Sequence, residues 1–255
     1  MNNQLSEKQK IEKNYHDKKY RGNIDPGVFD NRALKAYRFY WSLIGDVSGL
    51  KVLDFGCGNG WLSILLSRRG GKIWGIDISE ELIKQANQSA AKEELTEKIS
   101  FQEMSAENLT FKSNFFNLII GSAILHHTDL NLAINNLHRV LKLGGRAIFI
   151  EPMNQNIFLK IWRRLTPWRR SPTEKALTYE DSKIIQNIFP DAKFYFFNLT
   201  SIFTQGLLLF LPKNKLLLLI NDLLERFDGL CLRVFPSLGR YSAVLVMKLV
   251  KGNVK

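Results

Sequence analysis

Few cysteines and no long uninterrupted apolar run occur in this sequence. Its 255 residues include two cysteines, Cys57 and Cys231, which are too few for a disulfide framework or a cysteine-based metal cluster, and we expect no metal site. No apolar segment opens the chain, so we expect no secretory signal and a location in the reducing cytoplasm. The leucine-rich runs within residues 201–240 are interrupted before they reach the 18–20 apolar residues of a transmembrane helix.

Length and composition instead indicate one globular domain with a full core. Hydrophobic residues make up 45% of the chain, and the mean hydropathy is -0.13. The formal net charge is +12, with an isoelectric point near 9.7. Such a charge favours an anionic partner, which could be a phosphorylated substrate, a phospholipid surface or a nucleic acid.

Residues 51–79 show the pattern of a strand–helix–strand unit. An apolar run at 52–55 precedes three glycines at alternate positions, a helical pattern follows over 61–69, and a second apolar run ends near Asp77. Glycines at the first turn let a ligand approach the backbone, with the helix N-terminus facing it. An acid that closes the second strand can accept both hydroxyls of a ribose.

The glycine spacing separates two classes of nucleotide-like ligand. A dinucleotide fingerprint needs G-x-G-x-x-G, but Trp61 stands at the third glycine position and Gly60 comes one residue early. Asp54, two residues before the first glycine, is within reach of a ligand's ammonium group. D-x-G-x-G-x-G with the downstream acid Asp77 resembles the class I S-adenosylmethionine-dependent methyltransferases. The alternative is a glycine-rich turn of some other α/β protein.

The resemblance continues to Pro152 and implies both a fold and a cofactor. The fold is α/β and Rossmann-like: a seven-stranded, mostly parallel sheet of order 3-2-1-4-5-7-6, with strand seven antiparallel and an inserted helical cap. The cofactor is S-adenosyl-L-methionine, with S-adenosyl-L-homocysteine as product. Carried over by position, the cofactor-binding residues are Asp54, Gly56, Cys57, Gly58, Asn59, Gly60, Asp77, Ile78, Ser105, Ala106, Glu107 and Ser122.

The same resemblance assigns parts of the cofactor to these residues. Asp54 and the three glycines would hold the methionyl end, and Asp77 the ribose. Ile78 and Ala106 would cover the faces of the adenine, and the turn at 105–107 would contact its exocyclic nitrogen.

The turn after the fourth strand carries Leu125-His126-His127-Thr128-Asp129. It lacks the Asp/Asn-Pro-Pro-aromatic motif of enzymes that methylate base amines, and resembles the small-molecule branch that includes ubiquinone and menaquinone biosynthesis methyltransferases. His127 or His126 can deprotonate an attacking hydroxyl, because the pKa of histidine lies near working pH. Alternatively, one of them supports the following helix and never meets substrate.

The pattern divides the chain into three parts. Residues 1–45 form an N-terminal helical cover, in which we expect the first dozen residues to fray and 31–44 to be helical. Residues 46–200 and 241–250 form the cofactor-binding domain. Within it we expect helices at 79–94, 130–143 and 179–189, a helix stop at Gly144-Gly145, and strands at 99–104, 116–121, 146–150, 193–200 and 241–250.

The third part, residues 201–240, is an apolar helical insertion. We expect it to be a lid over the pocket, an interfacial hairpin on a bilayer, or a homodimer interface. The basic, aromatic segment 158–170 suits a peripheral contact with an anionic membrane, a phosphate clamp or a solvated linker.

The expected function is methyl transfer from S-adenosylmethionine to a small, lipophilic acceptor. The basic charge is compatible with an acidic or phosphorylated group on that acceptor, and we expect oxygen ahead of carbon as the methylated atom. One alternative is an RNA methyltransferase, which the net charge alone suggests. The other is a non-catalytic protein of this fold that keeps the cofactor site.

Overall fold

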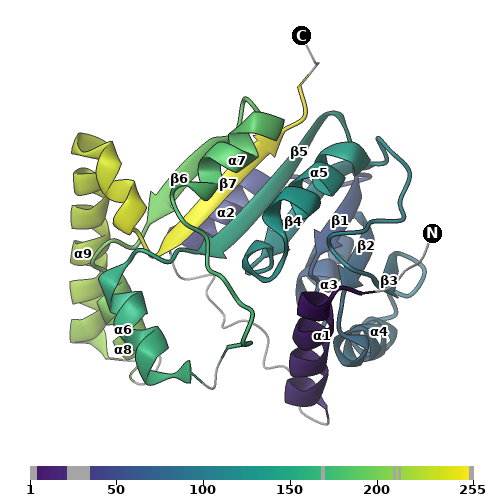
Figure 1. The fold of residues 1–255 in the computed structure, drawn as a ribbon, viewed down its shortest axis with the longest axis horizontal. Helices are drawn as coiled ribbons and strands as arrows, with labels where there is room; N and C mark the ends of the chain where they lie inside the picture. The colour runs from purple at the N-terminus through teal and green to yellow at the C-terminus, as the bar shows by residue number, and fades with distance from the viewer. Residues whose placement is uncertain (1–4, 22–34, 168–169, 209–210, 212–213, 253–255) are drawn as a thin grey trace.

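A seven-stranded sheet forms the centre of the molecule (Figure 1). The computed structural model describes residues 5–21, 35–167, 170–208, 211 and 214–252. The sheet order is β3-β2-β1-β4-β5-β7-β6, and β7 runs antiparallel to β5 and β6 while the other pairs are parallel. The predicted fold class is therefore confirmed. The strands are β1 (Lys51–Phe55), β2 (Lys72–Asp77), β3 (Ile99–Glu103), β4 (Phe116–Ser122), β5 (Leu141–Pro152), β6 (Lys193–Phe197) and β7 (Val244–Val250).

Helices cover both faces of the sheet. In β1, Leu53 and Phe55 belong to the core under α5 and α7, whereas Val52 belongs to the core under α2, α3 and α4. Side chains alternate along a strand, so a strand covered on both faces is apolar throughout. The helices and 3-10 turns are α1 (Glu7–Tyr20), α2 (Lys35–Ile44), α3 (Trp61–Arg68), α4 (Glu80–Lys92), η2 (Leu125–His127), α5 (Leu130–Val140), α6 (Ile157–Leu165), α7 (Asp181–Ile188), α8 (Ile202–Leu208), α9 (Lys215–Val234) and η4 (Pro236–Tyr241).

The N-terminal segment corrects one prediction. The first dozen residues do not fray as a whole, because α1 begins at Glu7 and packs beside α4. A capping box starts this helix: the Gln9 N–H donates to Ser6 Oγ at 3.3 Å, and the Ser6 N–H donates to Gln9 Oε1 at 2.8 Å. The helix predicted at 31–44 is described from Lys35 onward, and residues 31–34 lie outside the described part.

The glycine pair at 144–145 corrects a second prediction. The helix expected to reach residue 143 ends at Val140, and β5 starts at Leu141. Leu141 pairs with Phe116, and the register then shifts before the next pair. Gly144 lies in this irregular stretch with a φ of +71°, and its N–H donates to the Lys251 carbonyl at 2.8 Å. The glycines therefore form an irregularity inside the strand rather than a helix stop.

The segment 201–240 is helical where it is described, and it stands at the β6 edge of the sheet (Figure 1). Helix α8 packs between α6 and α9. None of the helices in the described ranges has the length and apolar character needed to cross a bilayer.

Candidate active site

A cavity of about 260 Å³ lies at the carboxyl ends of the central strands, beneath α1. The turn after β1 lines it with Gly56 and Gly58, and the end of β2 with Asp77 and Ile78. The turns after β3 and β4 complete the inner wall, and α1 forms the outer one. Open α/β sheets bind their ligands at this edge. Eight of the twelve predicted cofactor residues line the cavity: Gly56, Gly58, Asp77, Ile78, Ser105, Ala106, Glu107 and Ser122.

The glycine turn after β1 packs closely against the turn after β4 at the inner wall of this cavity. Gly56 has a φ of +76°, and a Cβ at this position would lie 2.5 Å from the Ile124 side chain. Asp77 joins the two ligand-facing loops, because its Oδ2 accepts the Gly58 N–H at 3.0 Å and its Oδ1 accepts the Ser79 N–H at 2.9 Å. Each carboxylate oxygen keeps a second lone pair, so Asp77 can still accept hydrogen bonds from a ribose.

Four predicted cofactor residues, Asp54, Cys57, Asn59 and Gly60, are absent from the cavity lining. Asp54 is 1% exposed and accepts the Ser63 hydroxyl of α3 at 2.6 Å. Burial raises the pKa of Asp54 to about 7, against the lowering effect of that hydrogen bond. These residues support the turn from behind, and direct contact with a cofactor stays a prediction for them.

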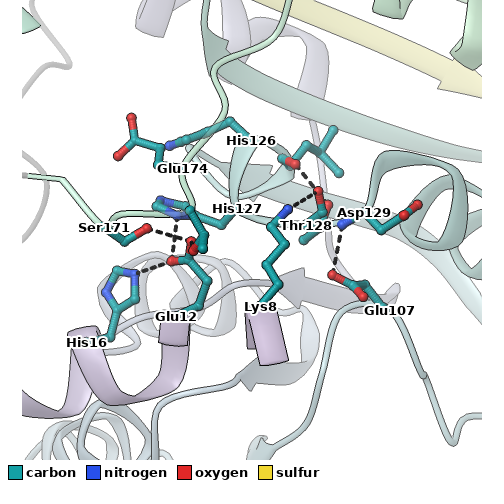
Figure 2. A network of polar contacts seen from close by, with 12 residues as sticks. Lys8, Glu12, His16, Glu107, His126, His127, Thr128, Asp129, Ser171 and Glu174 are labelled. Carbon is teal, nitrogen blue, oxygen red and sulfur yellow. Dashed lines mark hydrogen bonds and ion pairs between the residues drawn. The ribbon is translucent and has the colours of Figure 1, made fainter. Parts of the chain in front are cut away.

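The turn predicted to contact adenine is covered by α1. Gln9 Nε2 donates to Ser105 Oγ at 2.9 Å and to Glu107 Oε2 at 2.8 Å. Glu107 Oε1 also accepts the Asp129 N–H at 2.8 Å (Figure 2). These polar side chains therefore bind the helical cover and the next turn, while Ala106 contributes an apolar part of the cavity wall.

His126 forms a buried pair with Glu151 beside the cavity. Its Nδ1 lies 2.7 Å from Glu151 Oε2. The other oxygen of Glu151 accepts the backbone N–H groups of Ile124 and Leu125, each at 2.9 Å. A carboxylate held by these donors is an acceptor, so the Nδ1–H of His126 donates to it. In the neutral ring, Nε2 then carries the free lone pair.

His127 contacts a carboxylate from a different part of the chain. Its Nδ1 lies 3.0 Å from Oε2 of Glu12, a 3% exposed residue of α1 (Figure 2). The other oxygen of Glu12 accepts the hydroxyls of Ser171 and Thr173, each at 2.5 Å. Burial raises the pKa of Glu12, but its interactions with His127, His16 and Ser171 outweigh burial and hold that pKa well below its usual range. Burial lowers the pKa of His127.

The polar face of α1 is the part of the site that the sequence reasoning missed. Gln9, Glu12, His16 and Tyr20 line the cavity at helical spacing. The sequence pattern predicts a helical cover for this segment and does not include these polar contacts. A local signal was present, because Ser6 and Gln9 have the spacing of a capping box.

Comparison with known proteins places this fold and cavity in a family. Residues 46–193, more than half of the chain, match the family described as "Methyltransferase domain". A demethylmenaquinone methyltransferase of Lactococcus lactis is 32% identical over 161 residues, covering 59% of this chain and 64% of the relative. A ubiquinone biosynthesis O-methyltransferase of Coxiella burnetii is 35% identical over 111 residues, covering 43% of this chain and 46% of that relative. The chain thus matches about half to just under two thirds of these relatives' length.

A solved structure extends the likeness over nearly the whole chain. Magnesium protoporphyrin IX methyltransferase of Synechocystis, with bound S-adenosylhomocysteine, superimposes with a TM-score of 0.60 at 17% identity, covering 96% of this chain and all of that one. At this identity the likeness concerns the fold. The chain therefore belongs to the methyltransferase-domain family and has the class I methyltransferase fold, similar to the methyltransferases of quinone biosynthesis.

Proposed function

We propose that the chain transfers the methyl group of S-adenosylmethionine to an oxygen atom of a small, lipophilic acceptor that carries an acidic or phosphorylated group. The cofactor supplies the electrophilic methyl group when it is bound. Asp77 and the backbone of Gly56 and Gly58 would hold its ribose and methionyl parts, and Ile78 and Ala106 its adenine. The observation that carries the proposal is the buried pair of His126 and Glu151 at the cavity.

This pair has the arrangement of a general base. Glu151 holds Nδ1–H of His126, so Nε2 is the nitrogen that can take a proton from an acceptor hydroxyl. The buried carboxylate then stabilises the imidazolium that forms, as an orienting acid does for other catalytic histidines. Removing the hydroxyl proton as the oxygen attacks the methyl group makes that oxygen a better nucleophile, which is why we place the methyl group on oxygen.

The test is methyl-labelled S-adenosylmethionine incubated with the protein and a total cell extract. We expect label in the organic phase, on an oxygen atom identified by mass spectrometry. His126→Asn and Glu151→Gln should each lower kcat by about 10²-fold or more, while calorimetry shows unchanged cofactor affinity. His138→Asn is the matched control, because His138 packs against Phe189 away from the cavity.

Three outcomes would contradict the proposal. Full activity of His126→Asn would show that His126 is not the general base. A product methylated on carbon would show that the acceptor atom is not oxygen. Label confined to RNA would favour the RNA methyltransferase. Cofactor binding without label in any fraction would favour a non-catalytic role.

We further propose that the acceptor is taken from an anionic phospholipid surface, with the protein on the cytoplasmic side. Helix α9 supports this because three of its polar residues, Asn221, Glu225 and Asp228, are buried. Asp228 is 3% exposed and accepts the backbone N–H and hydroxyl groups of Thr200 and Ser201, at 2.7 to 3.1 Å. The large apolar residues of the helix are exposed instead: Leu216, Leu219, Leu223, Phe227, Leu230 and Val234.

The charges around this face fit a bilayer with anionic headgroups. Helix α6 adds exposed Ile157, Ile161 and Leu165, and it has no buried residue. Exposed cations on α6 and α9 are Lys160, Arg164, Lys215, Arg226 and Arg233. Part of the predicted membrane segment 158–170, residues 168–169, lies outside the described structure. An apolar face flanked by cations is typical of helices that lie in a membrane interface.

Vesicle co-sedimentation tests this surface. We expect the protein to bind phosphatidylglycerol vesicles more tightly than phosphatidylcholine vesicles, and Leu219→Gln with Leu223→Gln to weaken binding at least tenfold. If the double variant were recovered on vesicles as fully as the unaltered chain, the proposed membrane-binding surface would be refuted. A concentration-dependent dimer that the same double variant abolishes, without vesicle binding, would assign the face to a homodimer instead.

A further inference from the structure

Three of the four histidines of the chain lie together at the cavity, on the side covered by α1. His16 comes from α1 itself, and His126 and His127 from the turn after β4. Glu12, one helical turn before His16, points between His16 and His127 (Figure 2). This cluster joins segments more than 100 residues apart in the sequence.

The ligating atoms of Glu12, His16 and His127 are spaced as metal ligands are. Glu12 Oε2 lies 3.0 Å from His127 Nδ1 and 3.7 Å from His16 Nε2, and all three atoms lie within 4.8 Å of one another. Zinc binds nitrogen and oxygen at about 2.0–2.2 Å with tetrahedral angles, so neighbouring ligand atoms are about 3.4 Å apart. The two measured distances fall on either side of that value.

His16 is half-buried, with its side chain 20% exposed, and its ring nitrogens are poorly satisfied by the residues around them. The 3.7 Å distance from its Nε2 to Glu12 is too long for a hydrogen bond. Its Nδ1 is buried and has no hydrogen-bond partner among the described residues. A metal ion would give His16 Nε2 a bonding partner, since Glu12 is too distant to form a hydrogen bond with it.

The second carboxylate oxygen of Glu12, Oε1, makes the hydrogen bonds expected of the non-ligating oxygen in a metal-binding carboxylate. Ser171 and Thr173 both donate their hydroxyls to Oε1, which leaves Oε2 for the two histidines. Hydrogen bonds of this kind orient ligating carboxylates in metal sites. The neighbouring set of His126, His127 and Glu174 is less suitable, because Glu174 already pairs with Arg163 at 3.7 Å.

We propose that Glu12, His16 and His127 bind one divalent transition-metal ion, and that zinc is the ion that fits. Two imidazoles and one carboxylate form the ligand set of zinc sites that keep an open position. All three residues line the cavity, so that position faces it and can take a water molecule or an anionic oxygen. The ion would also fasten α1 to the turn after β4. The expectation of no metal site rested on the scarcity of cysteine, which these ligands do not need.

Zinc titration of the full chain, stripped with a chelator, tests the site without cofactor or acceptor. We expect one equivalent of zinc by calorimetry and, with cobalt(II), the intense visible absorption of a four-coordinate ion. His16→Asn should weaken zinc binding at least tenfold. Glu12 keeps its Ser171 and Thr173 hydrogen bonds in this variant, so we expect the fold to persist by circular dichroism. His138→Asn is the control and should bind zinc as the unaltered chain does.

Two results would overturn the site. One is no zinc bound by the unaltered chain, and the other is equal zinc affinity in His16→Asn and His138→Asn. The proposal does not depend on the proposed methyl transfer, and the two fail separately: zinc binding is read without substrate, and methyl transfer is read from the labelled product.

Discussion

Asp54 is expected to make the stability of the protein fall as the pH rises. Its pKa is raised from 3.8 to about 7 because the carboxyl is buried behind the glycine turn. Between these two values the unfolded chain has lost the proton and the folded chain keeps it, so each step up in pH favours unfolding. At 1.36 kcal/mol for each pKa unit, ionisation of Asp54 lowers the free energy of unfolding by ~4 kcal/mol in total above pH 7. About 2.5 kcal/mol of this loss develops between pH 5 and pH 8.

The perturbation is Asp54→Asn, which keeps the shape and can still accept the Ser63 hydroxyl but cannot ionise. Urea unfolding of both proteins at pH 5 and pH 8 gives the free energy of unfolding. We expect the variant to gain about 2.5 kcal/mol relative to the unaltered chain over this interval, since all other titrating groups are shared. Asp191→Asn, at an exposed position, should show no such gain. A gain below about 0.5 kcal/mol for Asp54→Asn would refute the reasoning.

The same variant tests whether Asp54 contacts the cofactor. If its carboxylate pairs with the ammonium group of S-adenosylmethionine, Asp54→Asn should weaken cofactor binding at least tenfold at pH 8. Unchanged affinity by calorimetry would show that Asp54 serves only to hold Ser63 and α3.

Further predictions concern the turn, the ribose site and α9. Asp77→Ala should weaken S-adenosylmethionine binding by ~2 kcal/mol, about 30-fold by calorimetry; unchanged affinity in a folded variant would contradict the ribose assignment. Gly56→Ala should lower the free energy of unfolding by more than ~1 kcal/mol, because of its positive φ and the clash with Ile124, whereas Gly206→Ala, with open space around it in α8, should not. Asp228→Ala should cost ~3 kcal/mol in urea unfolding, against less than ~0.5 kcal/mol for exposed Asp222→Ala; equal values would refute the inward polar face of α9.

Local patterns predicted most of the sheet and the inner wall of the site. Alternate glycines before a helical pattern placed the turn after β1, and Asp77 was expected at the end of β2, where it lies. The helix expected from residue 79 begins there, with the Ser79 hydroxyl accepting the Leu82 N–H at its N-terminus. Such features depend on residues a few positions apart, so a short stretch of sequence contains the whole signal. The strand order was available only through the resemblance, because pairing joins distant strands.

The glycine pair at 144–145 shows where local reasoning fails. Two glycines after a helical pattern usually end a helix. Here pairing with β4 and with Lys251 draws the segment into β5, so tertiary contacts decide the boundary.

The sequence by itself determined the family and the glycine turn with its acid, because spacing within one segment dictates them. Only the tertiary structure decided what surrounds the turn after β4. Glu12 meets His127 across 115 positions and Ser171 across 159, and no local pattern pairs them. It likewise decided that α9 directs Asp228 inward and leucines such as Leu219 and Leu223 outward. Which face of a helix is buried depends on the donors that it meets, and those donors belong to other segments of the chain.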